Sequence, residues 1–297
     1  MRRNTGYIGR FAPSPSGPLH FGSLVAATAS FLDARHHHGQ WLLRIEDLDV
    51  ARVRADSEAS ILATLSAFGF EWPQPPWRQS SRLERYQHAL TQLQQRIPLF
   101  HCQCSRRQLA AEGEACCVSE CRRLRCDPRD SALRADLSVL DPASIQDRSL
   151  GEVRFDPMVH RDVIVRRRDG VLAYQLAVVI DDADQGVTDV VRGADLLDST
   201  PWQLALLQAL QLPVPRYLHL PLLVEADGQK LAKTRHSVRL EGQNAVQTLR
   251  EALKQLKQPN PPIRISEPRE LLRAAAAAWQ PERFKGEREV RLPPADT

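Results

Sequence analysis

The amino-acid sequence contains no long hydrophobic run. No stretch of its 297 residues approaches the roughly 18 consecutive apolar residues that a membrane-spanning helix needs. The first five residues include two arginines, but no apolar segment follows them, so the sequence predicts no secretory signal peptide. We therefore expect a cytoplasmic protein without a membrane partner.

The sequence also lacks a strong net charge, an internal repeat and a low-complexity tract. Its 40 lysines and arginines nearly balance its 36 aspartates and glutamates, which leaves a net charge of +4. This mildly basic balance permits a nucleic-acid partner but does not by itself argue for one. The length is a prior for about two domains, and it is sufficient to bury a sizeable core.

Cysteine is absent outside one short segment. All six cysteines lie there: Cys102, Cys104, Cys116, Cys117, Cys121 and Cys126. Because disulfides are rare in a reducing compartment, this cluster favours a metal site over a disulfide framework. Four thiolates within about twenty residues suit a closed, tetrahedral Zn²⁺ site. The predicted ligands are Cys102, Cys104, Cys117 and Cys121. Cys116 is an alternative to Cys117, and reduced, metal-free cysteines are the competing interpretation.

The first hundred residues alternate between short apolar runs and amphipathic stretches. Strands are expected at residues 7–11 and 41–45, and a helix is expected at 22–35. Two further amphipathic helices are expected around residues 61–68 and 83–93. This order of elements predicts a parallel α/β sheet.

The chain beyond the cysteines combines further strands and helices. Asp169 and Gly170 form a strong turn signal, so they predict a hairpin between two strands. Ser199 is expected to cap the helix that follows it. Strands are predicted at 162–167, 171–179, 187–192 and 217–224, and helices at 199–210, 245–256 and 267–278. The polar end from Gln280 is expected to be loose.

Residues 10–23, with the sequence RFAPSPSGPLHFGS, carry the strongest functional signal. A rigid, proline-rich loop leaves the first strand and opens the first helix, whose N-terminus attracts anions. Gly22 would let the backbone approach a ligand closely, and His20 can donate a hydrogen bond to a phosphate. A proline-rich turn with a capping serine is the alternative interpretation.

This loop resembles the HIGH motif of class I aminoacyl-tRNA synthetases, in the form used by their glutamate-specific branch. His20 and Gly22 match the motif, whereas Ser23 replaces its second histidine, so that contact is not carried over. Residues 230–234, KLAKT, resemble the KMSKS loop, with Ala232 in place of its central serine. The resemblance implies ATP with Mg²⁺ as cosubstrate. It implies catalytic roles for His20, Gly22, Lys230 and Lys233, with Ser23 also near the ATP.

The same resemblance implies a pocket for glutamate. Stretches 41–49, 174–177 and 191–197 are also similar to this family, so the resemblance covers most of the chain. The implied pocket residues are Arg10, Phe11, Ala12, Pro13, Ser14, Glu46, Tyr174 and Arg192. Glu46 would take the ammonium, the arginines would take the carboxylates, and Tyr174 would supply a hydroxyl.

Each of these side chains also has a structural interpretation. Arg10 could pair with Glu46 or Asp47, Tyr174 could belong to the core of an apolar strand, and Arg192 could pair with Asp195. Asp181 and Asp182 are interpreted as structural or positioning residues.

The resemblance implies a Rossmann-type α/β core with an inserted, zinc-bearing α+β subdomain. The expected segments are the first half of the core at 1–100, the insertion at 101–190, the second half at 191–240 and a helical tail at 241–297. The chain resembles the truncated paralogues of this family, which lack anticodon-binding domains. For these, the resemblance implies a monomer that transfers glutamate to queuosine in the anticodon of tRNA(Asp). A shortened synthetase that charges the tRNA 3′ end and a non-catalytic RNA-binding module are the alternatives.

Overall fold

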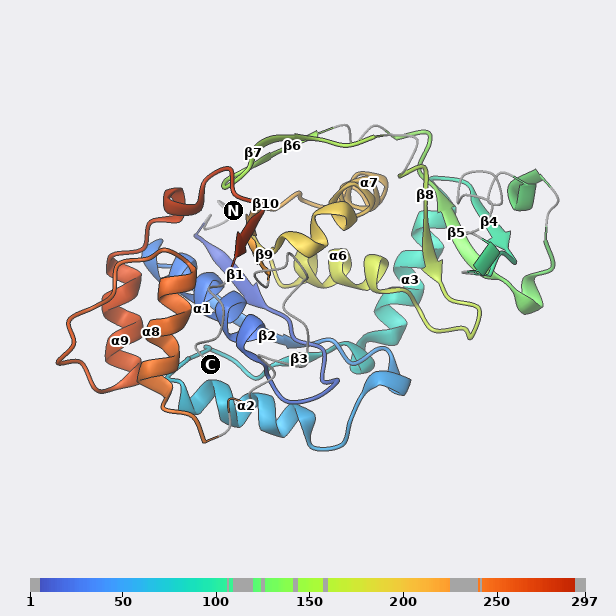
Figure 1. Ribbon diagram of the computed structural model, residues 1–297. Helices are drawn as coiled ribbons and strands as arrows, with labels where there is room; N and C mark the ends of the chain where they lie inside the picture. The colour runs from blue at the N-terminus through green and yellow to red at the C-terminus, as the bar shows by residue number, and fades with distance from the viewer. Residues whose placement is uncertain are drawn as a thin grey trace.

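The computed structural model describes residues 6–105, 107–108, 120–123, 126–140, 144–156, 160–224, 240 and 242–291. Its centre is a mainly parallel β-sheet (Figure 1). One set of strands follows the order β1 (Ile8–Phe11), β2 (Gln40–Ile45) and β3 (Trp77–Arg78). The other follows the order β9 (Asp189–Gly193), β10 (Arg216–Leu220), β6 (Ser144–Asp147) and β7 (Gly151–Arg154), in which only β7 is antiparallel. Thr188, just before β9, donates its backbone N–H to the carbonyl of Ile8, so β1 and β9 lie side by side.

Helices cover both faces of this sheet. The described helices are α1 (Phe21–His36), α2 (Ser57–Ala67), α3 (Leu83–Gln94), α6 (Tyr174–Asp184), α7 (Thr200–Leu210), α8 (Ala245–Gln255) and α9 (Pro268–Ala277), of which α3 packs on α6 and α7. Consecutive residues of a strand point to opposite faces. In β9, Val190 packs with Leu204 of α7, whereas Val191 belongs to the hydrophobic core around α1, α8 and α9. The expected α/β fold with a parallel sheet is therefore confirmed.

A smaller antiparallel sheet extends the molecule at the end opposite α8 and α9 (Figure 1). It consists of β4 (Leu99–Cys102), β5 (Ala132–Asp136) and β8 (Asp162–Arg166). A second hydrophobic core joins this sheet to α3, α6 and α7. Short 3₁₀ segments lie at Val50–Arg52, Gln79–Arg82, Pro128–Asp130, Ala194–Ser199 and Pro281–Phe284. The four-segment division of the chain stays a prediction.

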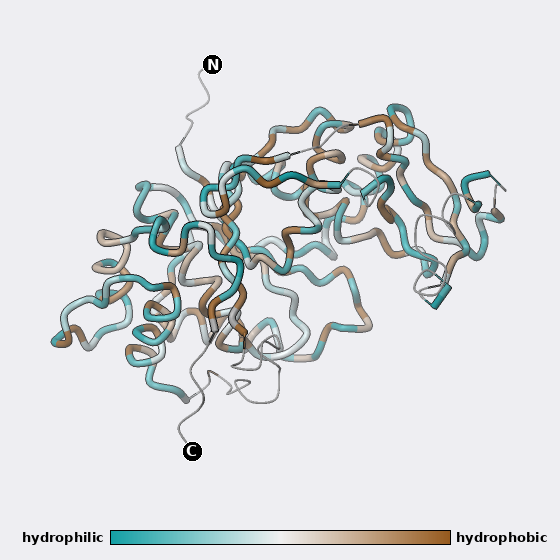
Figure 2. The backbone as a smooth tube through the Cα atoms, turned by 45° about the horizontal axis from the view of Figure 1, so that its top comes forward, coloured by the Kyte–Doolittle hydropathy of each residue, from teal (hydrophilic) through white to brown (hydrophobic). Residues whose placement is uncertain are grey.

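Hydrophobic and hydrophilic residues alternate along most of the backbone (Figure 2). This alternation is typical of helices and strands that bury one side and expose the other. No helix among the described residues is long and apolar enough to cross a membrane.

Tyr174 starts a helix, so the predicted strand at 171–179 is wrong. The turn at Gly170 forms, but after it the pairing is limited to one bridge between Leu172 and Arg166. The next residues form α6, in which positions 176–180 are all buried. Because a helix that is buried all round carries no polar stripe, its sequence does not differ from that of a buried strand.

The segment after Gln280 is ordered against the core, so the expected loose end is also wrong over residues 281–291. Phe284 is fully buried, and β12 (Glu289–Arg291) pairs in parallel with β11 (Leu222–Val224). The strand expected at 217–224 is divided into β10 and β11 around Pro221. These features depend on contacts between distant segments, which local polarity does not reveal.

Ser199 occupies the N-cap position of α7, but its side chain does not cap the helix. Its hydroxyl accepts a hydrogen bond of 3.0 Å from the Gln175 side-chain amide instead. The local sequence therefore predicted the start of the helix correctly and the role of the serine incorrectly.

Candidate active site

Four of the predicted pocket residues meet at the carboxyl edge of the parallel sheet. Arg10 lies near the end of β1, Glu46 directly follows β2, Arg192 lies near the end of β9, and Tyr174 opens α6. Burial raises the pKa of Tyr174; the charge of Glu46 adds to this, whereas Arg192 and Arg10 oppose it. Since loops at this edge of open α/β sheets form ligand sites, the arrangement defines a candidate active site.

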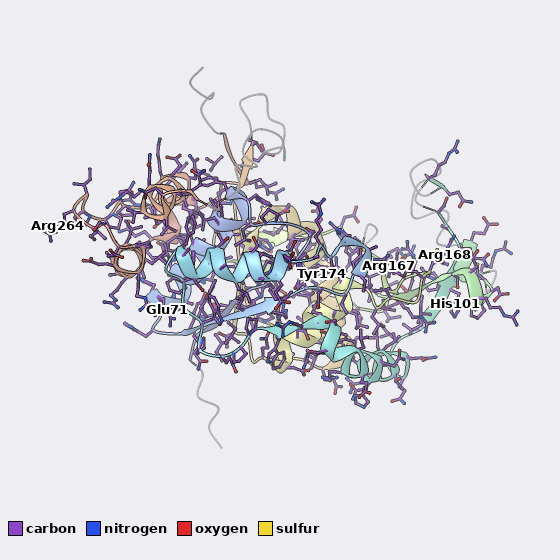
Figure 3. All side chains as sticks on the ribbon, turned by 90° about the horizontal axis from the view of Figure 1, so that it is seen from below. Glu71, His101, Arg167, Arg168, Tyr174 and Arg264 are labelled. Atoms are coloured by element: carbon purple, nitrogen blue, oxygen red, sulfur yellow. The ribbon has the colours of Figure 1, made fainter. Side chains whose placement is uncertain are left out.

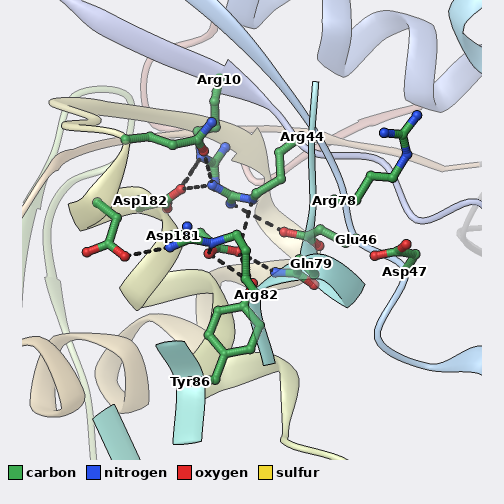
Figure 4. A network of polar contacts seen from close by, with 12 residues as sticks. Arg10, Arg44, Glu46, Asp47, Arg78, Gln79, Arg82, Tyr86, Asp181 and Asp182 are labelled. Carbon is green, nitrogen blue, oxygen red and sulfur yellow. Dashed lines mark hydrogen bonds and ion pairs between the residues drawn. The ribbon is translucent and has the colours of Figure 1, made fainter. Parts of the chain in front are cut away.

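Asp182 connects two buried arginines in this site (Figure 4). Arg10 Nε donates to Asp182 Oδ1 at 3.2 Å, and Arg44 Nη1 donates to the same oxygen at 2.8 Å. Burial opposes ionisation of this carboxyl group, but Arg10 and Arg44 outweigh it and hold the pKa of Asp182 below its usual range. Arg10 therefore pairs with Asp182, and not with Glu46 or Asp47 as the structural interpretation supposed.

Asp181, beside Asp182 in the sequence, faces α3 and the segment before it. It accepts hydrogen bonds from the side chains of Gln79, Arg82 and Tyr86 (Figure 4). These contacts agree with its interpretation as a structural residue, because they attach α6 to α3.

Glu46 lacks full compensation for its charge. Arg44 Nη2 lies 3.4 Å from Glu46 Oε1, and the Glu46 side chain is only 8% exposed. Burial raises the pKa of Glu46 to about 7, even though Arg44 and Arg10 act in the opposite direction. A ligand ammonium placed against this carboxylate would stabilise its ionised form.

Arg192 is the complementary case, a buried cation surrounded by neutral acceptors. Its guanidinium donates to His219 Nε2 at 3.1 Å, Gln203 Oε1 at 2.6 Å, Thr200 Oγ1 at 2.9 Å and the Leu196 carbonyl at 3.3 Å. Among the residues that the structure describes, no carboxylate forms an ion pair with it, and Asp195 is not its partner. Burial lowers the pKa of Arg192. The group is thus suited to bind an anionic ligand.

A cavity of about 400 Å³ adjoins this site and reaches the smaller sheet. Its lining includes Ser14, Glu46 and Tyr174 together with residues 162–164 of β8. Tyr174 lies near the middle of the molecule in Figure 3, Arg167 lies next to it toward the smaller sheet, and Arg168 lies farther out, near His101. The cavity therefore offers room for a second reactant next to the pocket.

The His20 side chain caps the N-terminus of α1. Its Nδ1 accepts the backbone N–H of Ser23 at 3.2 Å, and its Nε2 lies 3.1 Å from the Ser23 hydroxyl. A Cβ on Gly22 would come within 3.3 Å of the His20 ring, so the glycine leaves space for this exposed ring. His20 and Ser23 thus stand together at the positive end of the helix, where phosphates bind readily.

The rest of the loop is attached to the neighbouring strand. The carbonyl of buried Pro13 accepts the backbone N–H of Glu46 at 3.0 Å, which fixes both segments. Ser14 is exposed and lines the cavity, and Ala12 is half-buried. The Phe11 ring stacks on Trp41, at a centroid distance of 6.1 Å, so its side chain packs with the core.

The predicted lysines, Lys230 and Lys233, lie outside the described residues, and so do Cys116 and Cys117. Their roles stay predictions.

Three of the four predicted zinc ligands lie together. The sulfur atoms of Cys102, Cys104 and Cys121 are all within 4.8 Å of one another. Cys126 approaches the same group, with its sulfur 3.9 Å from the Cys121 carbonyl oxygen. Three thiols at this separation fit part of a tetrahedral thiolate site, so the cluster can hold a metal ion.

Sequence reasoning missed several residues of the site. Arg44 lies near the end of β2, two positions before Glu46, and this period-two spacing could have identified it. His219 and Gln203, which contact Arg192, lie in ordinary apolar elements and carry no local signal.

The chain is similar to known proteins over most of its length. A sequence profile for the catalytic domain of class I tRNA synthetases (E and Q) matches residues 8–256. The chain is 50% identical over 281 residues to a protein of Ectopseudomonas mendocina (strain ymp) named glutamyl-Q tRNA(Asp) synthetase, covering 93% of this chain and 94% of that protein. A protein of the same name from Acinetobacter baylyi (strain ATCC 33305 / BD413 / ADP1) is 43% identical over 280 residues, 94% of each chain.

The fold is similar to that of a solved glutamate-tRNA synthetase. The crystal structure of that enzyme from Elizabethkingia anophelis superposes with a TM-score of 0.79 at 22% identity, covering 97% of this chain and 68% of that chain.

Proposed function

The chain belongs to the family of class I tRNA synthetases of the E and Q type, and on this basis we propose that it activates glutamate with ATP and transfers it to queuosine in the anticodon of tRNA(Asp). As a member of this family it is an ATP-dependent ligase. One observation carries the choice of glutamate. Arg192 is a buried cation without an ion-pair partner among the described residues, and it shares the pocket with the carboxyl group of Glu46, whose side chain is 8% exposed.

The pocket suits an amino acid with an acidic side chain. Its ammonium would pair with Glu46, and its carboxylates would pair with Arg10 and Arg192, with the Tyr174 hydroxyl as a further partner. Arg10 already forms an ion pair with Asp182, so a ligand carboxylate should stabilise Arg192 more than it stabilises Arg10. Glutamine cannot supply this second negative charge, so it should bind much less well.

In the proposed first step, an oxygen of the α-carboxylate attacks the α-phosphorus of ATP. This forms an aminoacyl-adenylate and releases pyrophosphate. Negative charge builds up on the leaving group, and His20, the N-terminus of α1 and the predicted Lys230 and Lys233 would stabilise it. Mg²⁺ bound with ATP would neutralise part of the phosphate charge.

In the second step, a hydroxyl oxygen of the acceptor attacks the adenylate carbonyl and releases AMP. The cavity between Tyr174 and β8 supports the entry of this acceptor beside the pocket. The queuosine target is suggested by the names of the relatives. A shortened synthetase that charges the tRNA 3′ end remains the second candidate, since the same pocket would serve it.

The proposal is tested by locating the attached amino acid. Glutamate-dependent pyrophosphate exchange without tRNA should be measurable, and its absence would favour a non-catalytic RNA-binding module. Radiolabelled glutamate should attach to tRNA(Asp) from cells that make queuosine, but not to the same tRNA from cells that lack it. Nuclease mapping should place the label in the anticodon loop, whereas label at the terminal adenosine would restore the second candidate.

We also propose that Cys102, Cys104, Cys117 and Cys121 hold one Zn²⁺ ion. A saturated thiolate site has no open position for water, so its role would be to fold the segment beyond β4. The enzyme would act as a monomer in the cytoplasm, where ATP and tRNA are available.

A further inference from the structure

A buried carboxylate–imidazole pair stands behind Arg192. His219 in β10 lies between Asp147 at the end of β6 and Arg192 in β9. Its Nδ1 is 2.7 Å from Asp147 Oδ2, and its Nε2 is 3.1 Å from Arg192 Nε. The side chains of Asp147 and His219 are both 0% exposed. The three side chains therefore form a continuous line across neighbouring strands of the sheet.

The hydrogen bonds determine which ring nitrogen of His219 carries the proton. Arg192 Nε can only donate, so His219 Nε2 must accept, and the ring is neutral with its proton on Nδ1. Burial lowers the pKa of His219 in spite of the Asp147 hydrogen bond, which agrees with a neutral ring. Asp147 accepts the hydrogen bond from His219 Nδ1. Hydrogen bonds to this carboxylate outweigh the effect of its burial, so the pKa of Asp147 is held below the usual range.

Asp147 is itself held firmly. Its Oδ1 accepts the backbone N–H groups of Ser149 at 2.8 Å and Leu150 at 2.9 Å. Its other oxygen, Oδ2, faces both the backbone N–H of His219 at 3.1 Å and the His219 ring. The turn after β6 thus fixes the carboxylate, and the carboxylate fixes the imidazole.

The neutral His219 ring orients the Arg192 guanidinium without placing a carboxylate against that guanidinium. The Gln203 side chain acts in the same way, because its amide nitrogen donates to Gln175 and its oxygen is left to face Arg192. With four hydrogen bonds to described residues, the five N–H groups of Arg192 leave one on Nη1 for a ligand.

We propose that Asp147 and His219 are positioning residues for substrate selection: they hold Arg192 in place while leaving its charge for the carboxylate of the bound amino acid. This inference rests on the proposed function, because it takes Arg192 as a glutamate ligand. A carboxylate in direct contact with Arg192 would orient it equally well, but it would compete with the substrate. The neutral imidazole avoids that competition.

Three variants separate positioning from structural support. His219→Asn retains a donor for Asp147 but has no group that reaches Arg192. His219→Gln can present its side-chain oxygen to Arg192. In Asp147→Asn, the amide oxygen should stay with the two backbone N–H groups, so its NH₂ group faces the ring. That arrangement forces the proton to Nε2, where it points at another donor.

The experiment measures pyrophosphate exchange with glutamate and ATP varied separately. His219→Asn and Asp147→Asn should each raise the KM for glutamate by roughly tenfold or more, the effect expected for losing a hydrogen bond to a charged group. The KM for ATP should stay within about twofold of wild type. His219→Gln should restore most of the glutamate affinity. Thermal melting of each variant should be recorded in parallel.

An unchanged KM for glutamate in a folded His219→Asn protein would overturn the inference, as would an equal rise in both KM values. The ring can also be examined in the wild-type protein, which covers the case in which a variant fails to fold. Nitrogen-15 NMR of histidine-labelled protein, with His219→Gln for assignment, should show a neutral His219 protonated on Nδ1. A proton on Nε2 would overturn the inference. A wild type that activates no glutamate would instead overturn the proposed function.

Discussion

Arg44 Nη1 donates a hydrogen bond of 2.8 Å to Asp182 Oδ1 in the interior of the protein. The two residues are 138 positions apart, and they join β2 to α6 in contact with Arg10 and Glu46 of the candidate pocket. Because Arg44 also contacts Glu46, this one pair connects the stability of the fold to the electrostatics of the site.

The first prediction concerns Asp182. Asp182→Ala should reduce the free energy of unfolding by roughly 3–5 kcal/mol, because it removes the shared partner of two buried guanidinium groups. Urea denaturation would measure this loss. Asp184→Ala is the matched control, since Asp184 lies in the same helix but forms more exposed ion pairs with Arg82 and Arg85. Its loss should be about 1 kcal/mol or less. Equal losses would contradict a special role for Asp182.

The second prediction concerns pH. With its pKa raised to about 7, Glu46 is mostly protonated at pH 6 and mostly ionised at pH 8 in the free protein. If the ligand ammonium needs the ionised form, glutamate should bind about tenfold more weakly at pH 6 than at pH 8. Calorimetric titration with glutamate would give both affinities. The Glu46→Gln variant should bind glutamate weakly at both pH values. A wild-type affinity for glutamate that does not change with pH would argue against the pairing of Glu46 with the ligand ammonium.

The third prediction concerns amino-acid selection. Glutamine should be activated roughly a thousandfold less efficiently than glutamate, because an amide leaves the buried Arg192 uncompensated. Arg192→Ala should strongly reduce the activation of glutamate, so that glutamate and glutamine are activated at more similar rates. Arg154→Ala changes an arginine that is 80% exposed, and it should leave both rates unchanged. Comparable activation of the two amino acids by the wild type would exclude the proposed pocket.

The fourth prediction concerns the KMSKS-like loop. Lys233→Ala should lower the rate of adenylate formation by roughly two to three orders of magnitude, the usual effect of removing one donor that stabilises a developing charge. Thermal stability should change little. Lys254→Ala removes a lysine that is 66% exposed on α8, so it is a suitable control. Near-normal pyrophosphate exchange by Lys233→Ala would remove this lysine from the mechanism.

The fifth prediction concerns the metal. Protein prepared without chelators should contain about one zinc ion per chain by elemental analysis. Cys104→Ser and Cys117→Ser should each lose most of it, and their cysteine segments should become more sensitive to protease. The adenylate rate should fall far less than in Lys233→Ala. Cys126→Ser should keep the metal; zinc loss in Cys126→Ser but not in Cys117→Ser would identify Cys126 as the fourth ligand.

The sequence alone determined the broad class of the molecule. The order of apolar runs and amphipathic stretches predicted the parallel α/β sheet, because this periodicity reflects which faces are buried. The loop at residues 10–23 and the clustered cysteines were also visible, since each is a local run of chemically distinctive residues. The resemblance to a family then indicated Arg10, Glu46, Tyr174 and Arg192, and the structure brings these four together.

Only the tertiary structure decided how those residues are supported. Nothing local pairs Arg44 with Asp182 or lines up Asp147 and His219 behind Arg192, because each set comes from strands and helices far apart in the chain. Residues 176–180 are buried on every side, and such an apolar run has the same pattern in a helix as in a strand, so only the fold decided that Tyr174 begins a helix. The charge of each group in the site depends on burial and on neighbours that topology supplies. The raised pKa of Glu46 and the lack of an ion pair at Arg192 among the described residues therefore follow from the fold.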